Sequence, residues 1–122
     1  MSSAQIPVTV ATASGRITGV RRDGLHYFHS VRYSTIPSPF SPAKPLEGTC
    51  DQDAREPHPD DIALSITAPA DAAECPVVVY IHGGRYEHGT HEDPRLTGTT
   101  NARHGVIQVQ VGYRVGLAGF AR

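Results

Sequence analysis

The stretch Pro76-Val-Val-Val-Tyr-Ile-His-Gly-Gly-Arg-Tyr86 is the most informative part of this chain. Its first six residues form an unbroken apolar run, which predicts a strand over 76–81 that is buried on both faces. Gly83 and Gly84 follow, and glycine lets the backbone turn sharply and approach a ligand closely. Ligands of open α/β sheets collect outside the carboxyl ends of strands. The stretch therefore predicts an α/β sheet with a backbone binding loop at 82–86, whose N–H groups can hold a developing oxyanion.

The composition of the chain excludes several classes of protein. Its 122 residues suffice for one small domain. Eleven Lys and Arg stand against twelve Asp and Glu, a net charge of −1, so no charge excess predicts binding to nucleic acid or to an anionic membrane. No apolar run approaches the roughly 20 residues of a membrane-spanning helix, and residues 1–7 show no signal-peptide pattern. We therefore expect a cytoplasmic protein.

The chain divides into three parts. Residues 5–34 predict an antiparallel β-meander, because their short runs are rich in β-branched and aromatic side chains and include an Asp23-Gly24 tight-turn signal. Residues 35–61 contain six prolines and predict a long loop without regular helix or central strand. Residues 62–122 carry the core strands. The expected strands are 8–11, 15–20, 25–28, 62–67, 76–81 and 106–111.

A strand buried on both faces needs helices to cover it, and the chain offers few. The best helical candidate is a short segment at 95–104, weakened by Gly98 and three threonines. One explanation is a small sandwich whose strands cover each other. The other, favoured by the motifs below, is the front end of a larger α/β protein with an incomplete sheet. An uncovered apolar sheet is also expected to drive self-association.

Short elements follow one another in a characteristic order along the chain. They are Gly15-Arg-Ile-Thr-Gly19, Phe28-His-Ser-Val-Arg-Tyr-Ser34, Cys50-Asp-Gln52, Pro59-Asp-Asp-Ile-Ala-Leu-Ser-Ile66, the loop at 82–86, and Gly112-Tyr-Arg-Val-Gly-Leu-Ala-Gly-Phe120. Together they resemble the N-terminal part of the type-B carboxylesterase family, which includes cholinesterases and bacterial para-nitrobenzyl esterases. The resemblance implies that residues 1–122 are part of a single α/β-hydrolase domain. It also implies a serine esterase that cleaves small-molecule carboxylic esters through an acyl-enzyme, without a cofactor.

The resemblance places an oxyanion hole in the loop after the strand at 76–81. By position its donors are the backbone N–H groups of Gly84 and Arg85, and Gly83 contributes to the geometry of the loop. Arg85 stands where the family has a third glycine. Its N–H donor is expected to survive only if Arg85 avoids a positive φ, which a residue with a Cβ atom resists. The guanidinium would favour an anionic substrate group or point to solvent.

The resemblance also implies that the chain lacks the rest of the catalytic machinery. The family's Gly-x-Ser-x-Gly nucleophile elbow follows the Tyr-Arg element, and its acid and catalytic His come later still. None of the eight serines has that context; they are residues 2, 3, 14, 30, 34, 38, 41 and 65. Because no acyl-enzyme forms without a nucleophile, we expect a fragment that is inactive alone. The alternative is a non-catalytic protein-interaction module of the same superfold.

Histidines and carboxylates concentrate between positions 82 and 93 and raise the hypothesis of a zinc site. The residues are His82, Glu87, His88, His91, Glu92 and Asp93. Their spacing fits no recognised zinc motif, so we expect a solvated loop and no metal. The resemblance assigns Cys50 to a disulfide of the family, but Ile62 occupies the partner position. Cys50 and Cys75 are therefore expected to be free thiols.

Overall fold

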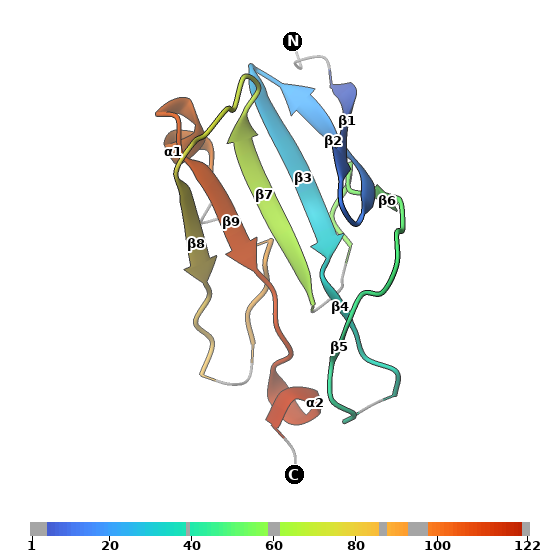
Figure 1. The fold of residues 1–122 in the computed structure, drawn as a ribbon. Coiled ribbons are helices and arrows are strands. Elements are labelled where there is room, and N and C mark those ends of the chain that lie inside the picture. Colours follow the sequence, from blue (N-terminus) through green and yellow to red (C-terminus); the bar gives the residue numbers. More distant parts are fainter. Residues whose placement is uncertain (1–4, 39, 59–61, 86–87, 93–97, 121–122) are drawn as a thin grey trace.

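The structure is a computed structural model that describes residues 5–38, 40–58, 62–85, 88–92 and 98–120. In this part of the chain, one open mixed sheet has the strand order β1-β2-β3-β7-β9-β8 (Figure 1). The strands are β1 (Ile6–Thr12), β2 (Gly15–Arg22), β3 (Leu25–Arg32), β7 (Ala63–Pro69), β8 (Val77–Ile81) and β9 (Ile107–Val111). This arrangement confirms the expected α/β architecture with an incomplete sheet and contradicts the small-sandwich alternative.

The first three strands form the expected antiparallel meander. Asp23 (φ 53°) and Gly24 (φ 77°) both lie in the left-handed region, as the tight turn of a two-residue hairpin requires. β7 pairs antiparallel with β3 and with β9, and β8 pairs in parallel with β9. The carboxyl ends of β8 and β9 therefore lie at the same edge of the sheet, at the lower end in Figure 1.

The Pro-rich connection contains short pairings that the sequence did not predict. β4 (Ser34–Thr35) pairs with β5 (Lys44–Pro45), and β6 (Gln52–Asp53) pairs in parallel with β2. Ala54, which follows β6, is fully buried, donates its N–H to Thr18 and accepts from the His29 N–H. The hydrophobic core lies where this segment packs beside β2 and β3. It contains Phe28, Val31 and Ala54, with Val8, Ile17, Leu64 and Ile66 packed against them.

The prediction that the strand at 76–81 is buried on both faces is wrong for this chain. Val79 is 58% exposed and Ile81 68% exposed. β8 is an edge strand, and helix α1 (Thr99–Arg103) packs against β3, β7 and β9 instead. Because no described segment covers β8, an apolar strand suited to a sheet interior lies at the surface.

Helical structure is sparse in the described residues, as the sequence indicated. α1 lies within the segment expected at 95–104, of which residues 95–97 are outside the described part, and α2 (Gly116–Phe120) follows β9. Neither helix is long enough to span a membrane. Cys50 and Cys75 are free thiols.

Candidate active site

The candidate site is the turn that follows β8. Residues 82–85 leave the carboxyl end of β8, and residues 112–113 leave the neighbouring end of β9. Parallel pairing of these strands brings the two segments together, although about thirty positions separate them in the sequence. The structure thus brings the predicted site residues Gly83, Gly84 and Arg85 to the edge of the sheet where ligands of such sheets collect.

His82 is held from three sides at the start of this turn. The residue is 6% exposed, and its ring stacks on the ring of Tyr113, with centroids 4.1 Å apart and planes 7° from parallel. The Tyr113 hydroxyl donates to the His82 carbonyl oxygen. His82 Nδ1 lies 2.6 Å from the carbonyl oxygen of Gly83. No local sequence signal indicates the role of Tyr113, because Tyr113 and His82 follow different strands and meet only in the fold.

The histidine tautomer follows from these partners. A carbonyl oxygen only accepts hydrogen bonds, so the proton of the neutral ring lies on Nδ1 and a lone pair lies on Nε2. Nε2 is buried and has no hydrogen-bond partner among the described residues. The ring therefore makes one strong polar contact, to its own loop, and leaves its second nitrogen unsatisfied.

Gly84 is a position where the turn requires glycine. Its φ is +145°, and a Cβ atom there would lie 1.5 Å from the carbonyl oxygen of His88. The Gly84 carbonyl in turn accepts the N–H of His88 at 3.2 Å. Gly83, in contrast, has space for a Cβ atom. The two adjacent glycines therefore differ, and Gly84 is the one that close packing excludes from substitution.

Arg85 has a backbone conformation that we expected a residue with a Cβ atom to resist. It adopts a positive φ of +56°. The left-handed region costs a residue with a Cβ atom about 1–2 kcal/mol, and Arg85 takes it nonetheless. The backbone at position 85 thus has the left-handed conformation that glycine favours, although the residue is an arginine. That side chain is exposed.

Gly89 closes the turn from the other side and was not predicted as a site residue. Its φ is +127°, and a Cβ atom would lie 2.1 Å from His82 Nδ1 and 2.6 Å from the Gly83 carbonyl oxygen. The only sequence signal is the glycine itself, which does not reveal what approaches it.

The expectation of a solvated histidine loop is wrong at His82 and His91, although His88 is exposed. His91 is 2% exposed, and its Nε2 lies 2.9 Å from the hydroxyl of Ser30, which is 4% exposed. Gln110 on β9 donates to the His91 carbonyl at 3.2 Å. These contacts dock the segment after the turn onto β3 and β9.

No group of three His, Cys, Asp or Glu side chains converges on a metal-sized site within the described residues. Glu87 and Asp93, which the zinc hypothesis included, lie outside them, as do residues 59–61 and Tyr86 of the family-like motifs. The glutamate that is described, Glu92, pairs instead with His29 at 3.2 Å.

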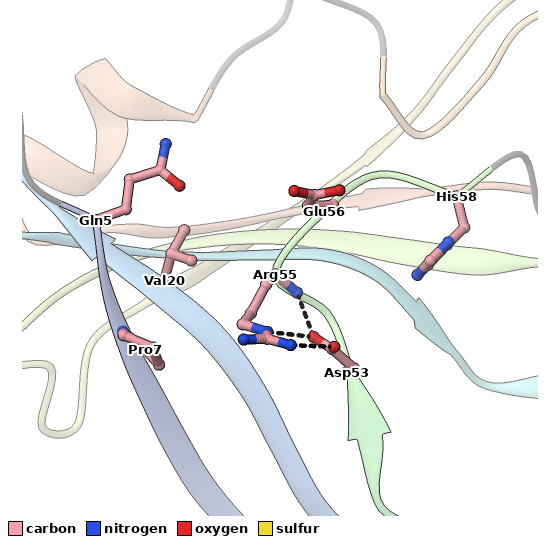
Figure 2. A pocket seen from close by; sticks show the side chains of 7 residues that line it. All are labelled: Gln5, Pro7, Val20, Asp53, Arg55, Glu56 and His58. Carbon is pink, nitrogen blue, oxygen red and sulfur yellow. Dashed lines mark hydrogen bonds and ion pairs between the residues drawn. The ribbon is translucent and has the colours of Figure 1, made fainter. Parts of the chain in front are cut away.

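A surface cavity of about 390 Å³ lies elsewhere, and Figure 2 shows its lining: Gln5, Pro7, Val20, Asp53, Arg55, Glu56 and His58. Arg55 donates to both carboxylate oxygens of Asp53, at 2.9 and 2.8 Å. These hydrogen bonds hold the pKa of Asp53 at about 2. None of the residues of the turn lines this cavity, so it is separate from the candidate site.

The chain is similar to known proteins in both sequence and fold. The sequence pattern of the carboxylesterase family matches residues 6–122. Para-nitrobenzyl esterase of Bacillus subtilis is 30% identical over 91% of this chain and 28% of its own length. A carboxylesterase of Geobacillus stearothermophilus superposes with a TM-score of 0.82 and 29% identity, covering 92% of this chain and 27% of its own.

A more distant enzyme gives the same fold. Juvenile hormone esterase of Manduca sexta superposes with a TM-score of 0.85 and 26% identity, covering 96% of this chain and 28% of its own. The chain thus spans less than a third of the length of each of these relatives.

Proposed function

This chain belongs to the carboxylesterase family, and from that membership we propose that it supplies the oxyanion loop of a serine esterase acting on small-molecule carboxylic esters. The observation that carries the proposal is the turn after β8, where Gly84 (φ +145°) and Arg85 (φ +56°) follow one another at the sheet edge. Two successive backbone N–H groups there would stabilise the negative oxygen that develops when an ester carbonyl is attacked.

In this proposal the loop acts through the backbone. A tetrahedral intermediate carries a negative charge that the substrate does not, so fixed N–H groups bind the transition state more tightly than the ground state. Loss of one such donor costs about 10²–10³ in kcat. None of the chain's serines has a Gly-x-Ser-x-Gly context, so we expect no acyl-enzyme on these 122 residues alone.

The Arg85 side chain suggests the kind of ester. It is exposed and makes no ion pair within the described residues. A guanidinium next to the oxyanion donors would attract a substrate that carries a carboxylate or phosphate close to the ester carbonyl. We therefore infer a preference for esters with an anionic group.

A chimera tests the proposal. In the chimera, this chain replaces the aligned segment of Bacillus para-nitrobenzyl esterase, and the relative supplies the remaining residues. If that exchange does not fold, a chimera that carries only residues 82–92 of this chain takes its place. We expect turnover of a chromogenic short-chain ester by the chimera, and no serine labelled by a fluorophosphonate probe in the isolated chain. A folded chimera without turnover, or a labelled serine in the isolated chain, would contradict the proposal.

The arginine has its own variant in the same chimera. Arg85→Gly keeps the backbone donor and removes the charge, so kcat for a neutral ester should stay within about tenfold. KM for an ester with an acidic group should rise. Equal effects on neutral and acidic esters would show that the guanidinium does not select the substrate.

A protein-interaction module is the second candidate, favoured by the exposed apolar strand β8. Under that alternative, the folded chimera would be inactive and substitutions on β8 would abolish association with a partner.

A further inference from the structure

We propose that His82 is a positioning residue that fixes the direction of the Gly84 N–H group, the first donor of the proposed oxyanion loop. The catalytic meaning of this inference rests on the proposed function, whereas the structural relationship can be tested without it.

The peptide unit that joins Gly83 to Gly84 is planar. The carbonyl of Gly83 and the N–H of Gly84 belong to one rigid trans peptide and point in opposite directions. A hydrogen bond to the carbonyl oxygen therefore fixes where the N–H points. His82 Nδ1, 2.6 Å from the Gly83 oxygen, supplies that bond.

The second donor is held by the same principle. The N–H of Arg85 shares a peptide unit with the carbonyl of Gly84, which accepts the His88 N–H at 3.2 Å. The direction of each proposed donor N–H is thus fixed by a hydrogen bond to the carbonyl oxygen of the same peptide unit. A hydrogen bond to that carbonyl also polarises the peptide and strengthens the N–H as a donor. Only the hydrogen bond to the Gly83 carbonyl comes from a side chain, so only that bond can be removed by substituting its donor.

The His82 ring is itself clamped. Tyr113 stacks on one face at 4.1 Å and donates its hydroxyl to the His82 carbonyl. The backbone of Gly89 approaches Nδ1 so closely that a Cβ atom there would lie 2.1 Å away. Because His82 is only 6% exposed, these contacts leave its ring a single orientation.

The unsatisfied nitrogen shows why the residue is a histidine. Phenylalanine would stack on Tyr113 equally well and would bury no unsatisfied nitrogen, whereas His82 leaves Nε2 without a partner among the described residues. A buried polar atom without a partner is unfavourable, so the benefit must come from the other nitrogen. That nitrogen contacts the Gly83 carbonyl. The geometry therefore assigns the role of His82 to its Nδ1–H group.

Nitrogen NMR of the 122-residue chain tests this inference directly. We expect the His82 ring to carry its proton on Nδ1, and the Gly84 N–H to show an order parameter of about 0.85, typical of rigid backbone. His82→Phe keeps the stack but removes the donor, so the order parameter should fall below about 0.6. His82→Asn places an amide N–H near the Nδ1 position and should restore it.

His104 provides the matched control. Its Nδ1 also contacts a carbonyl oxygen, that of Thr100 at 2.8 Å, but at the C-terminal end of helix α1. His104→Phe should leave the Gly84 order parameter unchanged. A proton on Nε2 of His82, or an unchanged Gly84 order parameter in His82→Phe, would overturn the inference.

Kinetics of the chimera provide a second readout that needs no soluble isolated chain. His82→Phe should lower kcat for a neutral ester by at least tenfold, up to the roughly 10²–10³ of a lost donor, with KM unchanged, and His82→Asn should recover most of it. A raised KM with unchanged kcat would overturn the inference. If the unsubstituted chimera is inactive, the proposed function fails and the NMR experiment alone decides the role of His82.

Discussion

His91 Nε2 lies 2.9 Å from Ser30 Oγ, and this buried contact ties the segment after the candidate oxyanion loop to strand β3. Ser30 lies at an irregularity in the pairing of β3 with β7 and adopts φ +51°. Its hydroxyl also accepts the His58 N–H at 2.7 Å. One serine thus joins the meander, the Pro-rich connection and the loop.

Ser30→Ala should lower the free energy of unfolding by about 1–3 kcal/mol, because it removes a hydroxyl that a buried histidine contacts. Ser30→Gly loses the same hydroxyl but relieves the positive φ, which offsets about 1 kcal/mol of that loss. Urea denaturation of the three proteins measures the difference. An unfolding free energy of Ser30→Ala equal to that of the parent would show that the contact does not stabilise the loop.

The pairing of Asp53 with Arg55 predicts a pH dependence. Because the folded-state pKa of Asp53 lies at about 2, below its ordinary value, the contribution of this pair to stability is present above that ordinary value and is lost as the pH falls toward 2. Arg55→Gln should raise the pKa of Asp53 toward its ordinary value, measured by carbon NMR of the carboxyl group. Arg103→Gln on helix α1 is the control. An Asp53 pKa in Arg55→Gln equal to that of the parent would show that Arg55 does not lower the pKa of Asp53.

The exposed edge strand predicts self-association. Val79 lies in the middle of β8 with 58% of its surface exposed, and apolar edge strands pair with other chains. Val79→Lys should reduce the associated fraction in sedimentation velocity, because a charge at an edge opposes pairing. Leu117→Lys on α2, also exposed, should not. A monomeric parent with a sharp thermal transition would contradict the prediction.

The sequence predicted the strands well because their patterns are local. Observed strands match the predicted meander and the runs at 62–67, 76–81 and 106–111. The predicted turn at Asp23 and Gly24 is also observed. The failures of the sequence prediction concern partners that are distant in sequence. The apolar pattern of β8 predicted burial, but burial depends on what covers the strand, and no described segment does.

The same limit applied within the candidate site. Gly83, Gly84 and Arg85 were predicted as site residues from the resemblance of their motif to the family's loop. The contacts that hold the His82 ring could not be predicted, because Tyr113 follows another strand and Gly89 approaches the ring only in the folded chain. His91 was expected in solvent because it stands in a polar segment. Its burial could not be predicted, since its partner Ser30 lies 61 positions earlier, on β3.

Two glycine variants in the esterase chimera separate the geometry of the oxyanion loop from backbone strain alone, with kcat as the measured quantity. Gly84 and Gly105 both have positive φ, but a Cβ atom at Gly84 would meet the His88 carbonyl at 1.5 Å, whereas one at Gly105 would meet nothing within 4 Å. Gly84→Ala should therefore displace the donor peptides and lower kcat by about 10²–10³ with little change in KM. Gly105→Ala carries the backbone strain alone and should leave kcat unchanged. Equal kcat values for the two variants would contradict the assignment of the oxyanion loop.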